Sequence, residues 1–151
     1  MIGLALLLAL QSRDALGTFD RWGAFRDASP LRCFAISQPV DKQPSGPFAS
    51  IATWPRQGVR NQLHIRLSRA RAPNARVTLS IGERRFELSA GDADAWAPDP
   101  RTDAAVVAAI RSGRSMSVET VAQSGAPFAD TYALKGAATA IDAAALGCAG
   151  K

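Results

Sequence analysis

The sequence predicts a mainly β protein with two short helices, folded as one antiparallel, β-sandwich-like domain. Short segments with alternating apolar residues recur between turn-forming residues, which is typical of antiparallel strands. Only two segments, one of them at the C-terminus, have helical periodicity. A chain of 151 residues, 47% hydrophobic and 21% charged, suits a single core and excludes general disorder.

The first seventeen residues have the pattern of an export signal. The apolar run from Ile2 to Leu10 is too short for a membrane span, which needs ~20 residues, but it suits the core of a secretory signal. Residues 15–17 (Ala-Leu-Gly) have the small-x-small form of a cleavage site. We therefore expect residues 1–17 to be a cleaved signal peptide and residues 18–151 to be the mature domain, located in the periplasm or elsewhere in the extracytoplasmic envelope. No basic residue precedes the run, so a buried N-terminal strand or helix is the alternative. No later segment is apolar enough to span a bilayer.

Strands and loops are predicted for the first part of the mature chain. Residues 18–37 predict two short strands around a turn at Asp27–Pro30. Residues 41–47 contain two prolines, a glycine and a serine, and they predict a loop. A strand over residues 48–54 ends before Pro55, because proline cannot donate to a central ladder.

The next segments have the clearest alternation in the chain. Leu63, Ile65 and Leu67 share one face of a predicted strand, and Gln62, His64 and Arg66 share its polar face. Farther on, Gly82-Glu83 has the Gly-X form of a two-residue type II′ turn. That turn pairs Ile81 with Arg84, Leu79 with Phe86 and Val77 with Leu88, which places four apolar side chains on one face.

Helical signals occur in two places. Asp99 or Thr102 can cap a helix whose apolar stripe is Val106, Val107 and Ile110, and Arg111 with Gly113 marks its end. Strands are predicted over 114–123 and 128–136, around a loop at 124–127. A second helix is predicted at the C-terminus, with Thr139 and Asp142 as a capping box and Gly147 just past the last turn. Its buried stripe is predicted to be Ile141, Ala145 and Cys148.

The two cysteines, Cys33 and Cys148, predict one disulfide. They are too far apart in the sequence for a recognisable metal motif, and an exported chain of this size favours oxidised cysteines. Two separate buried thiols are the alternative.

The charge and the motifs exclude several activities. The net charge of +5 comes from 15 Arg and 3 Lys, and the eight arginines between Arg56 and Arg85 alternate with apolar strand positions. This favours a solvated basic surface over a nucleic-acid site, which needs clustered cations. Metalloprotease, nucleophile-elbow, phosphate-loop and dinucleotide motifs are absent from the sequence. Four acids near Trp96 (Asp92, Asp94, Asp99 and Asp103) lack calcium-loop spacing and suit the start of a helix. We expect no metal and no cofactor.

A candidate partner-binding surface follows from the polar strand face. Its residues are Trp54, Arg56, Arg60, His64 and Arg66. The three tryptophans are expected to fill mainly the core, and Trp54, at a strand end beside Pro55, is expected to be the most exposed.

The order of these landmarks resembles the invasion-associated locus B family of exported bacterial proteins. Trp22 precedes Cys33, Trp54-Pro55 follows a strand, and Trp96 precedes a helix that includes "VVAAIRSGRSMSV". The "DTYALKG" segment, an alanine-rich helix and a terminal cysteine follow. The resemblance covers residues 19–148, although the N-terminal signal and the stretch between Cys33 and Trp54 depart from it.

The resemblance implies an exported, envelope-associated, β-rich protein. The family is named for a role in host-cell invasion, which need not apply to this chain, and it supplies no catalytic residues to transfer. We therefore expect a non-enzymatic protein that binds an unknown protein or envelope component. A small periplasmic hydrolase whose site assembles only in three dimensions, and a basic nucleic-acid-binding module, are the alternatives.

Overall fold

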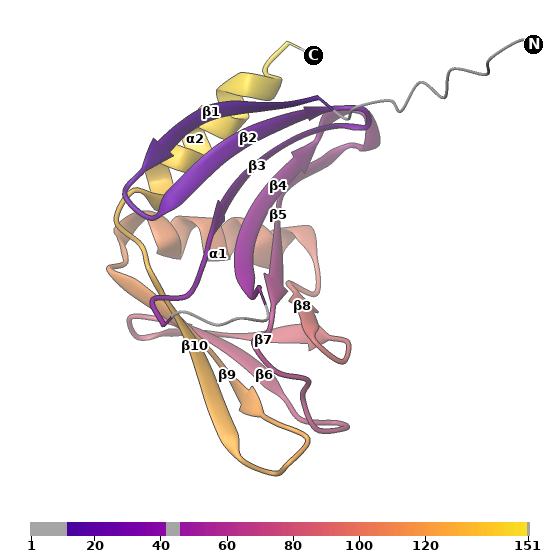
Figure 1. Ribbon diagram of the computed structural model, residues 1–151, viewed down its shortest axis with the longest axis vertical. Coiled ribbons are helices and arrows are strands. Elements are labelled where there is room, and N and C mark those ends of the chain that lie inside the picture. Colours follow the sequence, from indigo (N-terminus) through magenta and orange to yellow (C-terminus); the bar gives the residue numbers. More distant parts are fainter. Residues whose placement is uncertain (1–11, 42–45, 151) are drawn as a thin grey trace, which may run out of the picture.

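The computed structural model describes residues 12–41 and 46–150, so the apolar run from Ile2 to Leu10 lies outside the described residues. Every strand pairing among these residues is antiparallel, and their ten strands form one continuous sheet in the order β1-β2-β3-β4-β5-β8-β7-β6-β9-β10 (Figure 1). The predicted antiparallel, mainly β domain with two helices is confirmed. The strands are β1 (Arg13–Phe19), β2 (Trp22–Ala28), β3 (Leu31–Ser37), β4 (Phe48–Trp54), β5 (Val59–Arg66), β6 (Val77–Ile81), β7 (Arg84–Ala90), β8 (Asp94–Trp96), β9 (Ser115–Val121) and β10 (Pro127–Ala133), and the helices are η1 (Pro55–Gln57), α1 (Pro100–Ser112) and α2 (Ala137–Cys148).

The sheet bends, and its two halves meet at β8. Strands β1–β5 arch across the upper part of the molecule, and β6, β7, β9 and β10 cross below them (Figure 1). The short strand β8 joins the halves because Trp96 pairs with His64 of β5 on one side and with Ser89 of β7 on the other. Helix α2 packs against β1–β4, and α1 packs against β5 and β7. The helices therefore cover one face of the sheet, and the upper and lower halves belong to one continuous sheet.

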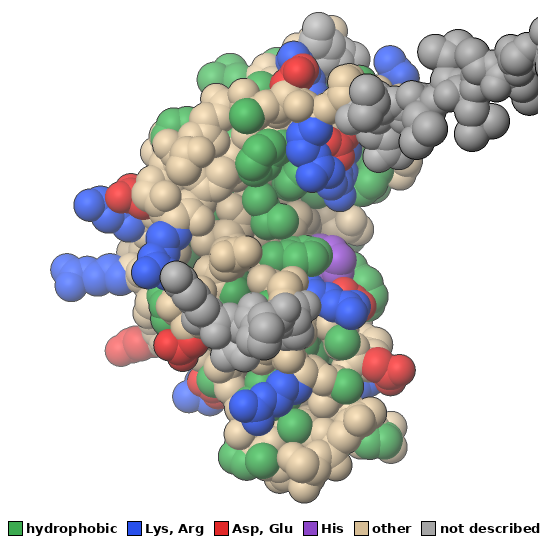
Figure 2. Space-filling model, in the orientation of Figure 1, with side chains coloured by type: hydrophobic (Ala, Val, Ile, Leu, Met, Phe, Trp, Pro, Cys, Tyr) green, Lys and Arg blue, Asp and Glu red, His purple; other side chains and the backbone are tan. Residues whose placement is uncertain are grey.

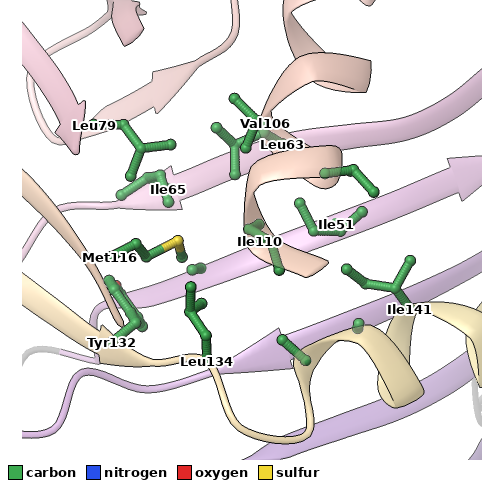
Figure 3. Packing of buried hydrophobic residues seen from close by; sticks show 14 of the residues in the cluster. Ile51, Leu63, Ile65, Leu79, Val106, Ile110, Met116, Tyr132, Leu134 and Ile141 are labelled. Atoms are coloured by element: carbon green, nitrogen blue, oxygen red, sulfur yellow. The ribbon is translucent and has the colours of Figure 1, made fainter. Parts of the chain in front are cut away.

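One hydrophobic core unites both halves of the sheet and both helices (Figure 3). Leu63 and Ile65 of β5 point into it, as their alternation predicts, and neither is exposed. Leu79 and Met116 come from the lower half, and Ile141 comes from α2. Complete burial of a side chain of this size contributes about 1.5–3 kcal/mol, so the core holds the bent sheet to its helices.

The hairpin and the first helix follow their local sequence signals. Strands β6 and β7 pair in the predicted register around Gly82, whose φ of 58° suits the first central position of a type II′ turn. Helix α1 begins after Asp99, whose carboxylate accepts the Thr102 backbone N–H at 2.7 Å. Hydrogen bonds from the Thr102 backbone N–H and from the Thr102 side chain lower the pKa of Asp99.

The predicted start of α2 is wrong. The helix begins at Ala137, and its N-cap is Gly136, which has a φ of 88° and no side chain to bond the first N–H groups. Thr139 therefore lies inside the helix and forms no capping box. Asp142 instead accepts from Arg111 of α1 at 2.8 Å, and this hydrogen bond lowers the pKa of Asp142.

The buried stripe and the end of α2 also differ from the prediction. Ala145 is exposed, and Ala144 takes its place beside Ile141 and Cys148, because the residues four and seven before Cys148 lie nearer its side of the helix than the residue three before it. Gly147 lies within the helix. A Cβ there would stand 2.5 Å from Leu16 Cδ1, so the glycine allows α2 to approach β1 closely.

The disulfide between Cys33 and Cys148 joins β3 to the end of α2, as the sequence predicts. Its S–S distance is 2.02 Å and its Cα atoms are 5.9 Å apart. Both residues are buried, and they lie where α2 crosses the sheet. The bridge encloses a sequence separation of 115 residues.

Strand β1 contains the predicted signal-peptide boundary. Residues 13–17 pair with β2, and Arg13 bonds Asp27 while Arg26 bonds Asp14. A cut after Gly17 would remove these contacts from the domain.

Candidate partner-binding face

The outer face of the upper sheet half is the side of β2–β5 and β8 that points away from the helices. Cys33 faces α2, to which it is bonded, so the adjacent residues Arg32 and Phe34 point outward. Strand pairing aligns Ile36, Ser50, His64 and Trp96 in one row across this face. The pairing thus gathers residues that are far apart in the sequence.

An arginine lies between two aromatic rings at one end of the outer face. The Arg32 guanidinium carbon is 4.1 Å from the ring centroid of Phe34 and 5.2 Å from that of Trp54. Phe25 stacks on Phe34 with a centroid distance of 5.5 Å. Phe34 is therefore buried although it points away from the core. We call Phe25, Arg32, Phe34 and Trp54 the Arg32 cluster.

A carboxylate offsets part of the positive charge at this end of the face. Asp27 accepts from Arg13 Nε at 2.7 Å and from Arg32 Nη2 at 3.1 Å. The hydrogen bond from Arg13 is the main reason that the pKa of Asp27 is lowered. Cationic side chains here are thus held in place by an ionised aspartate as well as by the rings.

The His64 cluster is the second group on the face, and it consists of Phe48, His64, Arg66, Asp94 and Trp96. His64 stacks on Trp96 at a centroid distance of 5.4 Å and meets the edge of Phe48 at 5.1 Å. Its Nε2 lies 2.8 Å from Asp94 Oδ1, and Arg66 donates to Asp94 Oδ2 at 2.7 Å. Trp96 is 37% exposed, so an aromatic surface at this cluster is open to solvent.

Figure 2 views this face of the molecule. Apolar side chains and arginines are intermixed over β1–β5, and the single histidine borders an apolar patch. Arginine and tryptophan are enriched in the central residues of protein interfaces, where their large side chains bury much area.

A groove lies beside the outer face, between the start of β5 and helix α1. It has a volume of about 730 Å³, and its lining includes Arg60, Asp99, Asp103 and Val107. Asp103 Oδ1 accepts the Leu63 backbone N–H at 2.9 Å. Burial raises the pKa of Asp103. His64 does not line the groove.

The family model described as "Invasion associated locus B (IalB) protein" matches residues 25–145. The chain belongs to the invasion-associated locus B (IalB) family. The matched segment runs from β2 into α2 and contains both clusters of the outer face in full. No protein of curated function and no solved structure matches the chain.

The IalB fold brings together part of the predicted surface. His64 and Arg66 meet through Asp94, and Trp54 contacts Arg32. Arg56 is exposed in η1, whereas Arg60 lines the groove next to α1. The five predicted residues therefore occupy four places, and only His64 and Arg66 share one.

One prediction about the tryptophans is wrong in this IalB chain. Trp96, and not Trp54, is the exposed tryptophan, because the Arg32 side chain covers part of the Trp54 ring. Trp22 is completely buried.

Sequence reasoning missed most of the outer-face residues. Phe34, Phe48 and Asp94 join the face only through pairing with other strands. One sequence signal could have found them. In β3 and β4, the positions that alternate with the inward-pointing residues hold aromatic and basic side chains.

The acids near Trp96 have separate structural roles in the IalB chain. Asp94 pairs with His64 and Arg66, Asp99 caps α1 and Asp103 bonds Leu63. Within residues 12–41 and 46–150, no group of three or more His, Cys, Asp or Glu side chains is arranged to hold a metal ion. No helix among the described residues is long and apolar enough to cross a membrane.

Proposed function

We propose that this IalB-family protein is an exported, non-enzymatic protein of the bacterial envelope that binds a partner through its outer face. The observation that carries the proposal is the pairing of Arg32 with two aromatic rings on the same face as the exposed Trp96. A partner can desolvate this preorganised surface at low cost in side-chain entropy, since the rings and the salt bridges already hold the side chains.

The charges of the face favour a protein or another envelope component over a nucleic acid. Asp27 pairs with Arg13 and Arg32, and Asp94 pairs with Arg66. These arginines are therefore less available to a row of phosphates, which binds unpaired cations. Elution from heparin at low salt is the expected result, and a steep salt dependence would favour nucleic acid instead.

A hydrolase is the rival function. It would be favoured by acids and a histidine converging in one pocket. The groove contains Asp99 and Asp103, but His64 is held by Asp94 outside the groove. This separation supports binding over acid-base catalysis.

Site-specific photo-crosslinking in the producing cells tests the proposal. A benzophenone amino acid at position 96 replaces one aromatic ring with another on the outer face, and the matched control carries it at Val121, which is 36% exposed in β9. A discrete adduct at position 96 and none at position 121 is expected. Adducts of the same mass from both positions, or none from position 96, would contradict the proposed face.

We further propose that the signal peptide is removed before Arg13. The predicted cut after Gly17 would delete the ion pairs of Arg13 and Asp14 and the contact of Leu16 with α2. The mass of the protein purified from the envelope fraction gives its first residue. A mass that corresponds to a chain beginning at Thr18 would return the boundary to Gly17. A mass that includes Met1 would contradict the proposal that the signal peptide is cleaved.

A further inference from the structure

The groove between β5 and α1 has no role in the outer face, and it has the form of a ligand site. Its volume of about 730 Å³ lies within the roughly 300–1,000 Å³ of small-molecule pockets. Such pockets are mostly apolar with a few placed polar groups. Val59, Ala104 and Val107 supply apolar wall here, and Arg60 and Asp103 supply opposite charges from different elements.

The groove exists because β8 is short. Strand β8 pairs with β5 only from His64 to Arg66. After Trp96 the chain reaches Pro98 and Pro100, which cannot donate to a ladder, and it turns away into α1. The edge of β5 before His64 is thus left beside α1 without a paired strand.

Asp103 occupies the place where the ladder ends. Its side chain bonds the Leu63 N–H that a longer β8 would have engaged. The residue is only 7% exposed, and among the described residues no cation pairs with its carboxylate. A buried carboxylate normally has a paired charge, because desolvation of an isolated ion is costly. Burial, together with the nearby charge of Asp99, accordingly raises the pKa of Asp103.

Arg60 provides the complementary charge. It is exposed on the β5 side of the groove, and within the part of the chain that the structure describes it forms no ion pair or side-chain hydrogen bond. Arg111, which also lines the groove, already donates to Asp142. The groove therefore contains one buried acid without a cation and one arginine without an anion.

We propose that this groove binds a zwitterionic ligand with an apolar body, of the class of apolar amino acids and short peptides. The ligand ammonium donates to Asp103, its carboxylate accepts from Arg60, and its side chain lies against Val107 and Ala104. A simple cation would be repelled by Arg60, and a simple anion would be repelled by Asp103. Charges of both signs on an apolar wall match a ligand that carries both.

The test uses the full mature protein, labelled with ¹⁵N, and titrates it with valine and with the tripeptide Ala-Val-Ala. Saturable shifts of the amide signals of Leu63, Ala104 and Val107 are expected with at least one probe. The probe that binds more tightly shows whether the ligand is a free amino acid or a peptide. N-acetyl-Ala-Val-Ala, which lacks the ammonium, is expected to bind at least tenfold more weakly than the free tripeptide, and N-acetylvaline more weakly than valine by the same factor.

Two variants separate binding from a purely structural role of Asp103. Asp103→Asn keeps an acceptor for the Leu63 N–H but removes the charge, and it is expected to weaken binding at least tenfold while the protein stays folded. Ala104→Leu narrows the groove from an exposed helix position without changing any charge, and it is expected to weaken binding as well. Arg85→Gln, which removes an exposed arginine of β7 outside the groove, is the matched control and should bind as the unaltered protein does.

Several results would overturn the proposal. These are the absence of saturable shifts with both probes up to 10 mM, equal binding of acetylated and free probes, and unchanged binding by Asp103→Asn. The outcome is independent of the outer face, since Trp96 and Arg32 do not line the groove. Crosslinking at position 96 and ligand binding in the groove can therefore fail separately.

Discussion

The indole Nε1 of Trp22 donates to the backbone oxygen of Ala133 at 2.8 Å, across 111 residues of sequence. Trp22 begins β2, near one end of the strand order, and Ala133 ends β10, the strand at the other end. The Val40 N–H also donates to the Thr131 oxygen at 2.8 Å. The two ends of the bent sheet are thus bonded to each other around the core.

Replacing Trp22 by phenylalanine tests this link. The smaller ring keeps the residue apolar but leaves the Ala133 oxygen without its donor, so the free energy of unfolding should fall by about 2–3 kcal/mol. Urea unfolding followed by circular dichroism measures the change. Trp96→Phe, at an exposed position, should change it by no more than about 0.5 kcal/mol, and equal losses in the two variants would argue against the link.

Contacts with several other parts of the fold hold the segment from Asp130 to Gly136 in place. Asp130 is buried and accepts from the Ser68 N–H, and Tyr132 is fully buried in the core. Ala133 bonds Trp22, and a Cβ at Gly136 would lie 2.1 Å from the Phe19 oxygen. The segment thus joins β10 and the start of α2 to several other parts of the fold.

Gly136→Ala is expected to lower the free energy of unfolding by more than about 3 kcal/mol, because the methyl group adds a backbone clash to an unfavourable φ. Gly125→Ala is the matched control. Gly125 has the same φ of 88° but no atom within 4 Å of the added Cβ, so the cost should be only about 1–2 kcal/mol. Similar losses for the two variants in urea unfolding would show that the contact with Phe19 has no effect.

Removing the disulfide should be costly in this chain. A closed loop of roughly 100 residues reduces the entropy of the unfolded state by the equivalent of about 4.7 kcal/mol. The double variant Cys33→Ala, Cys148→Ala should lose a large part of this, and the loss should be measurable by urea unfolding under non-reducing conditions. A loss below about 1 kcal/mol would mean that native strain cancels the entropic term. Mass spectrometry before and after reduction should show a gain of two hydrogens in the unaltered protein.

The pH dependence of stability should reveal Asp103. Its folded-state pKa is raised, mainly by burial and also by the charge of Asp99, while the Leu63 N–H opposes the shift. The protonated form therefore favours folding: its contribution is complete below the unfolded pKa of about 3.9 and is lost as the pH rises through the folded pKa. Between the unfolded and the folded pKa, the free energy of unfolding of the unaltered protein should therefore fall relative to that of Asp103→Asn. Urea unfolding from pH 3 to pH 8 measures both proteins, and a constant difference would contradict the raised pKa.

Features set by neighbouring residues were predictable from the sequence. The Gly82 turn and its register, and the Asp99 cap of α1, depend on a few adjacent positions. The inward alternation of Leu63 and Ile65 likewise needs only the strand period. Local signals were sufficient there because no distant segment competes with them.

Features set by strand order were not predictable. His64 and Trp96 stack only because β8 pairs with β5, and nothing in either segment specifies that partner. The early start of α2 depends on the approach of Gly136 to Phe19, a contact with the first strand. The polar strand face was therefore recognised, whereas the aromatic rings that complete it were not.

The position of the cystine has a consequence for damage to the chain. Cys33 and Cys148 lie near the two ends of the described domain, so most of its exposed turns, including residues 123–126, lie between them. A protease that cuts one of these turns leaves two fragments that remain covalently attached and are still packed around a common core. A nicked molecule should keep its full mass on a non-reducing gel and separate into fragments only when the bridge is reduced. In an extracellular or periplasmic setting, the protein would thus tolerate a single break that would separate a chain without such a bridge.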